Sequence, residues 1–306
     1  MSRPAADPLQ VHIHRYELAL SKLDPAKLKE QLPSIHAEYS FFLGEQYDSP
    51  QNLGRLQAYL SDTLIKSLFL DTKAAYPRLD STESELGAAF AYYHKAFPDE
   101  KIPRVYTYVS GLDYENPVHL ADSVMLIGLD MYLGQSSRYY KQLGLPEYKC
   151  LSLGKNYIAA DCMSQLAYRL IRDSKRDKTL LDWMILQGKV MYFLDATLLA
   201  GKDAFKISYK PDQLEWCKKN EALIWSFFIS QKLLFSTDKK NVQDFISEAP
   251  FTKGFPKESP GRIGVWVGWQ IVRAYMENNS GLSLKQLLED ENSQQILKLS
   301  GYKPEK

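Results

Sequence analysis

The stretch PRVYTYVSG at residues 103–111 decides the fold class. Its β-branched and aromatic run between a Pro and a Gly is typical of a strand. A second and more apolar run, VMLIGL at residues 124–129, predicts a neighbouring strand. Near the start, VHIHRYE at residues 11–17 alternates apolar and polar side chains, which is the period of a half-buried strand. The sequence therefore predicts one small sheet.

The rest of the chain has helical patterns. Residues 24–75 read as helical, beginning with Asp24 as N-cap and Pro25 at the first helical position. The other expected helices span residues 81–96, 157–172, 179–199, 211–234, a segment from Ser259-Pro260 to about residue 279, 283–289 and 293–299. A small sheet between helical regions predicts an α+β fold that is mainly α-helical.

The domain organisation is simple, because the sequence contains no internal repeat and no long linker. We expect one domain over residues 11–306, with N-terminal helices and the sheet in 11–155 and a helical part in 156–306. Residues 1–10 are polar and Pro-rich, which predicts a disordered tether. This start fits a native cytosolic protein, and it fits equally a chain whose signal and anchoring Cys have been removed.

Composition excludes some classes of function. The 38 Lys+Arg nearly balance the 37 Asp+Glu, so the sequence lacks the concentrated basic surface that a nucleic-acid partner requires. No apolar stretch is long enough to span a bilayer. The three cysteines form no CxxC pair, and we expect them to be buried free thiols.

A family resemblance is carried by residues 127–134 with 145–148, residues 179–182, 187–189 and 192–195, residues 248–251, 258–264 and 268–272, the strand at 11–16, and Trp216-Cys217 near Asn220-Glu221. These segments cover nearly the whole chain, and in sequence and order they resemble the GldB family of gliding-motility lipoproteins. GldB-like proteins in turn look like distant relatives of zincin metallopeptidases. The resemblance therefore implies a zincin-like fold, in which a small sheet is followed by a helix that carries HExxH.

In this sequence the zinc motif is degenerate. Placed on the helix expected after the sheet, the motif puts Asp161 and Gln165 at the two His positions and Cys162 at the position of the base, while the next helix offers Gln187 as third ligand. No His follows His119, so the two-His helix is impossible here. We expect no metal, no cofactor and no catalytic residue. We also expect Asp161, Gln165 and Gln187 to converge on one site between two helices.

Other polar residues are weaker candidates. Asp130, Tyr132 and Arg262 are candidate binding residues, and Arg262 could hold an anionic group or pair with a carboxylate. His12 and His14 share one strand face, which suggests a metal, but no third ligand lies nearby in the sequence, so we expect exposed strand residues.

Paired carboxylates could also carry acid–base chemistry. Asp182 and Asp195 flank one expected helix, and the simpler interpretation is that they cap it or bond to its ends.

The resemblance implies a lipid-anchored, periplasm-facing protein of the outer membrane that supports gliding motility and the linked type IX secretion machinery. Its partners would be envelope, motility or secretion proteins, and the membrane through the anchor. The missing His residues favour a pseudo-metallopeptidase that binds peptides or proteins without catalysis. Two alternatives remain open: a hydrolase with a non-zincin site of Asp or Glu residues, and a glycan-binding envelope-assembly factor that uses the many aromatic side chains.

Overall fold

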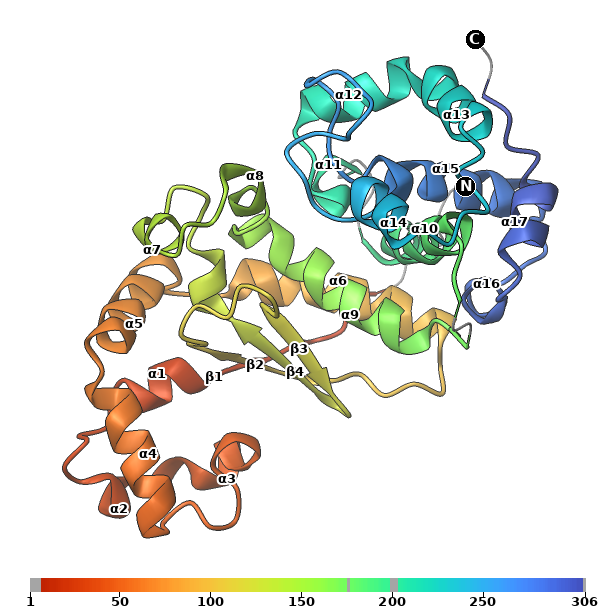
Figure 1. Cartoon of the computed structure of the whole chain (residues 1–306). Helices are drawn as coiled ribbons and strands as arrows, with labels where there is room; N and C mark the ends of the chain where they lie inside the picture. Colours follow the sequence, from red (N-terminus) through yellow and green to blue (C-terminus); the bar gives the residue numbers. More distant parts are fainter. Residues whose placement is uncertain (1–6, 175–176, 199–202, 305–306) are drawn as a thin grey trace.

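A computed structural model describes residues 7–174, 177–198 and 203–304 (Figure 1). The strands are β1 (Ile13–Arg15), β2 (Arg104–Tyr108), β3 (Val118–Ala121) and β4 (Val124–Gly128). The α-helices are α1 (Tyr16–Leu20), α2 (Leu28–Gln31), α3 (Pro33–Leu43), α4 (Pro50–Ser61), α5 (Thr63–Ala75), α6 (Asp80–Ala96), α7 (Arg138–Gln142), α8 (Glu147–Cys150), α9 (Ile158–Leu170), α10 (Leu180–Thr197), α11 (Asp203–Ile207), α12 (Pro211–Lys219), α13 (Glu221–Ser230), α14 (Lys239–Phe245), α15 (Ile263–Asn278), α16 (Leu284–Glu289) and α17 (Ser293–Ser300). Two 3-10 turns, η1 (Leu129–Tyr132) and η2 (Lys155–Tyr157), precede α7 and α9. The expected α+β, mainly helical class is confirmed.

The sheet has four strands in the order β1-β2-β4-β3. The three predicted strands are β1, β2 and β4, and they are parallel. The fourth, β3, was not predicted and runs antiparallel to β4. Its four residues are too few to show an alternating pattern. The hairpin turns at Asp122, whose φ of 47° is one that Asp tolerates better than most residues.

Helices cover both faces of the sheet. Figure 1 shows α6 and α9 lying across one face. Tyr106 of β2 points to the opposite face and contacts Phe42 of α3, with ring centroids 5.8 Å apart. Ile13, Val105 and Met125 are buried partners across three neighbouring strands, so the sheet lies inside the core.

The helical half is built around close packing of α10 against α15. A Cβ added at Gly268 would lie 1.9 Å from the carbonyl oxygen of Met184, and one added at Gly188 would lie 2.3 Å from the carbonyl oxygen of Gly268. Only glycine allows the two backbones to approach this closely. Each of these two glycines lies against the main chain of the other helix.

Two predicted helices have different limits in the structure. Asp24 does not begin a helix: its carboxylate accepts the N–H of Ala26 at 2.9 Å in a turn, and the 24–75 region contains four separate helices. The expected helix over 211–234 is interrupted at Asn220, whose side-chain amide donates to the carbonyl of Trp216 at 2.8 Å. In both places a short polar side chain competes with the helix for backbone bonds.

Three further expectations concern the N-terminal tether, the cysteines and segments that could span a membrane. Residues 1–6 of the expected tether lie outside the described residues, and just after them the N–H of Leu9 donates to the carbonyl of Gly87 at 3.1 Å. Cys150, Cys162 and Cys217 are free and buried, as predicted. Among the described helices, none combines the length and apolar character needed to cross a membrane.

Candidate functional site

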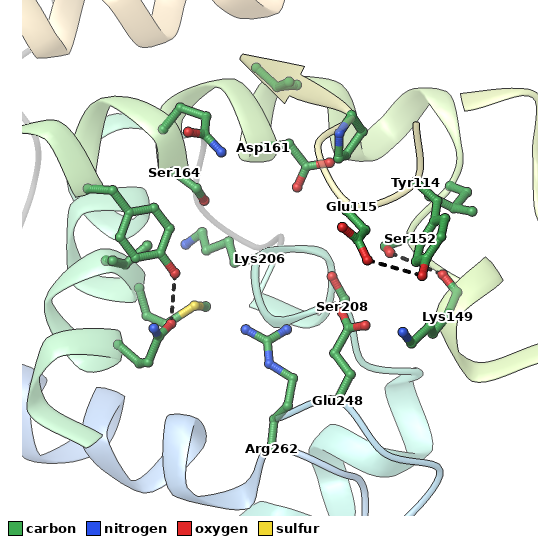
Figure 2. Close-up of a pocket in the computed structure, with 18 of the residues that line it drawn as sticks. Tyr114, Glu115, Lys149, Ser152, Asp161, Ser164, Lys206, Ser208, Glu248 and Arg262 are labelled. Carbon is green, nitrogen blue, oxygen red and sulfur yellow. Dashed lines mark hydrogen bonds between the residues drawn. The ribbon is translucent and has the colours of Figure 1, made fainter. Parts of the chain in front are cut away.

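A cavity of about 480 Å³ lies between α9, α10, the segment leading into β3 and the start of α15 (Figure 2). Its polar lining includes Tyr114, Glu115, Lys149, Ser152, Asp161, Ser164, Gln165, Tyr168, Gln187, Lys206, Ser208, Glu248 and Arg262. A cavity of this size is in the range that small ligands and side chains of a partner occupy.

One face of α9 forms a wall of this cavity. Asp161, Ser164, Gln165 and Tyr168 follow each other at spacings of three, one and three residues, which brings them onto a single helix face. On the other faces of the helix, Cys162, Met163 and Leu166 are buried in the core. The amphipathic pattern of α9 therefore directs the polar face to the cavity.

The facing wall comes from α10. Gln187 lines the cavity, and its side-chain oxygen accepts a hydrogen bond from the hydroxyl of Tyr168 at 2.9 Å. Asp161, Gln165 and Gln187 thus line one cavity between two helices, which is the arrangement that the predicted convergence requires. The relationship to zincins, from which the convergence was argued, remains a prediction.

Cys162 does not take part in this site. Its side chain is fully buried and does not line the cavity, and burial raises the pKa of its thiol well above the ordinary value. The position assigned to the zincin base therefore faces the core of the protein.

Asp161 has an unusual environment for a carboxylate. Burial raises its pKa from an ordinary value of 3.8 to about 7, against the hydrogen bond from Tyr132 and the positive charge of Arg262, which lower it. The hydroxyl of Tyr132 donates to Asp161 Oδ2 at 2.7 Å. A titratable group with such a shift in a cavity is a common property of functional sites.

Arg262 reaches the same cavity from the opposite wall, as Figure 2 shows. It lies at the N-cap of α15 with a left-handed φ of 58°. Its guanidinium donates to the carbonyl of Ile207 at 3.3 Å. Among the described residues, no carboxylate lies within the 4.0 Å of a salt bridge to Arg262, which acts on Asp161 only through its charge at longer range.

The remaining charges differ in how far they are already neutralised. Lys206 Nζ is paired with Asp195 at 2.7 Å and Asp203 at 3.2 Å. Lys149 Nζ lies 5.4 Å from the centre of the Tyr114 ring.

Sequence reasoning missed Lys149 and the acidic residues at 115 and 248. Position 248 opens one of the segments that resemble the family, so that resemblance could have pointed to it.

Two of the candidate binding residues are buried and form hydrogen bonds within the protein. Asp130 is fully buried, and its carboxylate accepts the backbone N–H groups of Ser110 and Leu112, each at 2.7 Å. Tyr132 is also buried and reaches the site only through Asp161. Neither lines the cavity, so Arg262 alone of the three faces it.

Of the two carboxylates at the ends of α10, Asp182 caps the helix as the simpler interpretation predicts, whereas Asp195 binds side chains of other helices. Asp182 and Thr179 form a capping box at the start of the helix. Asp195, in its last turn, accepts hydrogen bonds from Trp269 Nε1 at 2.8 Å and Arg273 Nε at 2.7 Å.

The three ligand positions of the degenerate motif do not suit zinc. Asp161 is the one carboxylate among the three positions of the degenerate motif, and the other two carry amides, which are poor zinc ligands. Within the described part of the chain, one group of three His, Cys, Asp or Glu side chains comes close enough to share a metal. That group contains His12 and His14 at β1, on the opposite edge of the sheet from β3, which borders the cavity.

Comparison with known proteins identifies the family of the chain. No curated protein and no solved structure matches the chain. A family model described as gliding motility protein GldB matches residues 3–304, which is nearly the whole length, in agreement with the resemblance in the sequence. The chain belongs to the GldB family of gliding motility lipoproteins.

Proposed function

We propose that this chain is a non-catalytic binding component of the cell envelope that supports gliding motility and the linked type IX secretion machinery. In this proposal it is a periplasm-facing lipoprotein held at the outer membrane by an N-terminal lipid anchor. Its cavity beside α9 receives a segment of a partner protein. The observation that carries the proposal is the guanidinium of Arg262, which faces the cavity without a carboxylate partner among the described residues.

The chemistry of the cavity favours an acidic group of that partner. A guanidinium binds a carboxylate through two parallel hydrogen bonds, which fixes both position and orientation. Asp161 lies on the facing wall, and with a pKa of about 7 it holds a proton over part of the neutral range. A protonated Asp161 can donate to the bound carboxylate, whereas an ionised one repels it. The acidic group is an Asp or Glu side chain or a C-terminal carboxylate.

The absence of catalysis is proposed from the chemistry of the side chains. Hydrolysis by zinc needs three protein ligands, an open position for water and a base beside the metal. The motif positions on α9 and α10 offer one carboxylate and two amides, and Cys162 is turned into the core. A degenerate peptidase fold with an intact cleft would serve as a scaffold that binds a peptide and does not cleave it.

One observation favours a hydrolase as the second candidate. Asp161 has a pKa near neutrality and shares the cavity with Glu248, and pairs of carboxylates in different environments can divide acid and base roles. A glycan-binding role would rest on the aromatic rings of Tyr114 and Tyr168 at the rim of the same cavity.

The proposal is tested by affinity purification of the lipid-anchored form from cells. The wild-type chain is compared with Arg262→Gln, which removes the positive charge from the cavity, and with Gln165→Trp, which fills the cavity. Arg55→Gln, on the exposed side of α4, is the matched control. We expect a motility or secretion protein to be retained by the wild type and the control and to be lost from both cavity variants. Capture of glycan without protein, or cleavage of the captured protein, would support the rival functions instead.

A further inference from the structure

A pair of histidines lies at the free edge of the sheet. His12 precedes β1 and His14 lies within it, and Ile13 between them points into the core with 2% of its surface exposed. Side chains two residues apart on a strand share a face, so both imidazoles project to the same side. Their ring centroids are 4.9 Å apart. The sequence suggested this arrangement but offered no third ligand near it.

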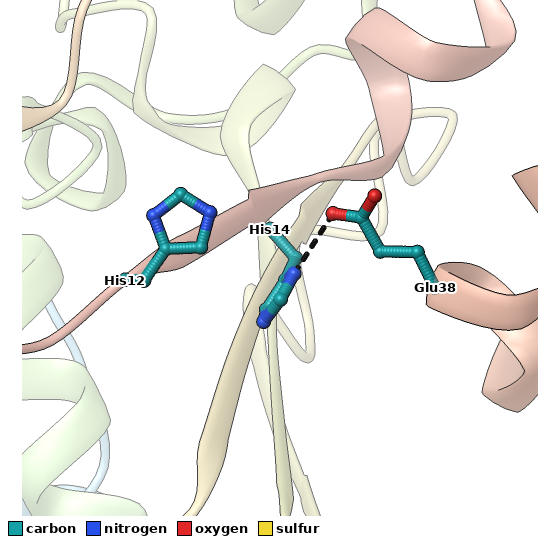
Figure 3. Close-up of side chains that lie close together, drawn as sticks. All are labelled: His12, His14 and Glu38. Carbon is teal, nitrogen blue, oxygen red and sulfur yellow. Dashed lines mark hydrogen bonds and ion pairs between the residues drawn. The ribbon is translucent and has the colours of Figure 1, made fainter.

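The structure supplies the third side chain from a distant segment. Glu38 of α3 places its Oε1 atom 2.9 Å from Nδ1 of His14 (Figure 3). One ligand atom from each of His12, His14 and Glu38 can be chosen so that all three lie within 4.8 Å of one another. The sequence separation of 24 between Glu38 and His14 explains why the sequence alone did not associate them.

Tyr106 positions two members of this cluster at once. It is the register partner of His14 on β2, and its ring stacks on the imidazole at 4.8 Å with an interplanar angle of 25°. Its hydroxyl donates to the backbone carbonyl of Glu38 at 3.3 Å. Tyr106 is itself buried, so it ties the edge of the sheet to α3. Groups behind a metal ligand commonly fix its orientation in this way.

We propose that His12, His14 and Glu38 bind a divalent transition metal ion of the zinc class. Two imidazole nitrogens and one carboxylate oxygen form a ligand set that zinc accepts with its fourth position open. Around a tetrahedral zinc these atoms would stand about 3.3 Å apart. His12 can close the remaining gap by rotation, because 74% of its side chain is exposed.

The surrounding charges are compatible with a bound cation. Glu83 Oε1 lies 3.6 Å from His12 Nδ1 and adds a second carboxylate beside the cluster. Arg104 opposes it, with its guanidinium carbon 5.9 Å from the centre of the Tyr106 ring. The two negative charges of Glu38 and Glu83 therefore outnumber the positive charge of Arg104 beside the cluster. A metal here would add a link between β1 and α3, which are already joined by the hydrogen bond of His14 to Glu38 and by the contacts of Tyr106.

The competing explanation is a hydrogen-bonded pair of His14 and Glu38 that binds no metal. Substitution of His12 distinguishes this explanation from a metal site. The pair does not need His12, whereas the metal site does. His12→Ala is also safe for the fold because the side chain is mostly exposed. The matched control is His119→Ala, because Nε2 of His119 lies 3.5 Å from Asp113 in a pair of similar exposure.

The test uses the full chain without an affinity tag, stripped with a chelator and titrated with ZnCl₂ by calorimetry, with metal analysis after gel filtration. We expect one zinc per chain, and an affinity at least about tenfold weaker in His12→Ala, His14→Ala and Glu38→Gln. Zinc should raise the melting temperature of the wild type and of His119→Ala more than that of the three ligand variants. Failure of the wild type to bind zinc overturns the proposal. So does binding that survives His12→Ala unchanged, or that falls equally in His119→Ala.

Discussion

Tyr132 and Asp161 are joined by a hydrogen bond of 2.7 Å that connects the turn after β4 to the cavity-facing side of α9. Because burial raises the pKa of Asp161 to about 7, the folded protein keeps a proton that the unfolded chain releases near 3.8. Between these two values the native state binds more protons than the unfolded state, so stability falls as pH rises through this window. Above pH 7 Asp161 is ionised in both states, and its buried charge lowers the free energy of unfolding by the full amount.

Asp161→Asn should remove this dependence. We expect the change in the free energy of unfolding between pH 4 and pH 8 to be smaller in the variant by about 1–3 kcal/mol, a range reduced because the side chain is partly exposed. Urea denaturation at five pH values measures it. Asp212→Asn, on the exposed side of α12, is the control and should follow the wild type. Parallel curves for wild type and Asp161→Asn would contradict the raised pKa.

The ion cluster at the end of α10 should be essential for the helical half. Asp195→Ala leaves Lys206, whose side chain is 3% exposed, and Arg273 with Asp203 as their remaining carboxylate partner among the described residues. Removing one partner from a buried cluster leaves uncompensated charge, so we expect a loss of about 3 kcal/mol in the free energy of unfolding. Glu215→Ala breaks the exposed pair with Lys218 and should cost at most about 0.5 kcal/mol. Equal losses in chemical denaturation would show that the cluster is not effectively buried.

The crossing of α10 and α15 should tolerate no added methyl group. Gly268→Ala would place its Cβ 1.9 Å from the carbonyl oxygen of Met184, so the helices must move apart. We expect a loss of about 3 kcal/mol or more, measured by thermal and chemical denaturation. Gly54→Ala is the matched control, because a Cβ there meets nothing within 4 Å in the middle of α4. This control should gain about 0.5–1 kcal/mol from helix propensity. A neutral Gly268→Ala would refute the close backbone contact.

Regular patterns in the sequence predicted most of the fold. The β-branched runs located β2 and β4, and the spacing on α9 placed Asp161 and Gln165 on one face. Short elements were the failures: β3 has four residues, and the helix breaks at Asp24 and Asn220 depend on single side-chain bonds that no periodicity records.

The site was predictable only where its residues share an element. Glu248 and Lys149 reach the cavity from loops and short helices, and Glu38 meets His14 only after α3 packs on the sheet. These contacts depend on tertiary packing over long sequence separations. Asp130 was selected for its chemistry, yet its carboxylate holds the backbone of Ser110 and Leu112.

Peptidase activity that depends on zinc at α9 should be absent, and rebuilding the motif should not create it. The combined variant Asp161→His, Cys162→Glu and Gln165→His restores HExxH, but position 162 is fully buried. A carboxylate there would be desolvated and the protein destabilised by several kcal/mol, in the range of about 2–7 kcal/mol for an uncompensated polar group. Digestion of a peptide library with and without ZnCl₂ measures the activity.

That digest is best done in a His14→Ala background, so that zinc bound at the edge of the sheet does not contribute. Asp161→Ala is the control. Zinc-dependent cleavage that disappears in Asp161→Ala would overturn the pseudo-enzyme interpretation. Cleavage without zinc would favour a hydrolase with a different site.

The most direct measurement places a photo-crosslinking amino acid at position 165, inside the cavity, in the lipid-anchored form of the protein in cells. The same amino acid at position 55, on the exposed side of α4, reports random contacts. If the cavity binds a partner, position 165 captures one discrete envelope protein, position 55 does not, and Arg262→Gln abolishes the capture. A partner captured from position 55 and never from position 165, or captured from 165 equally well in Arg262→Gln, would contradict binding in this cavity through Arg262.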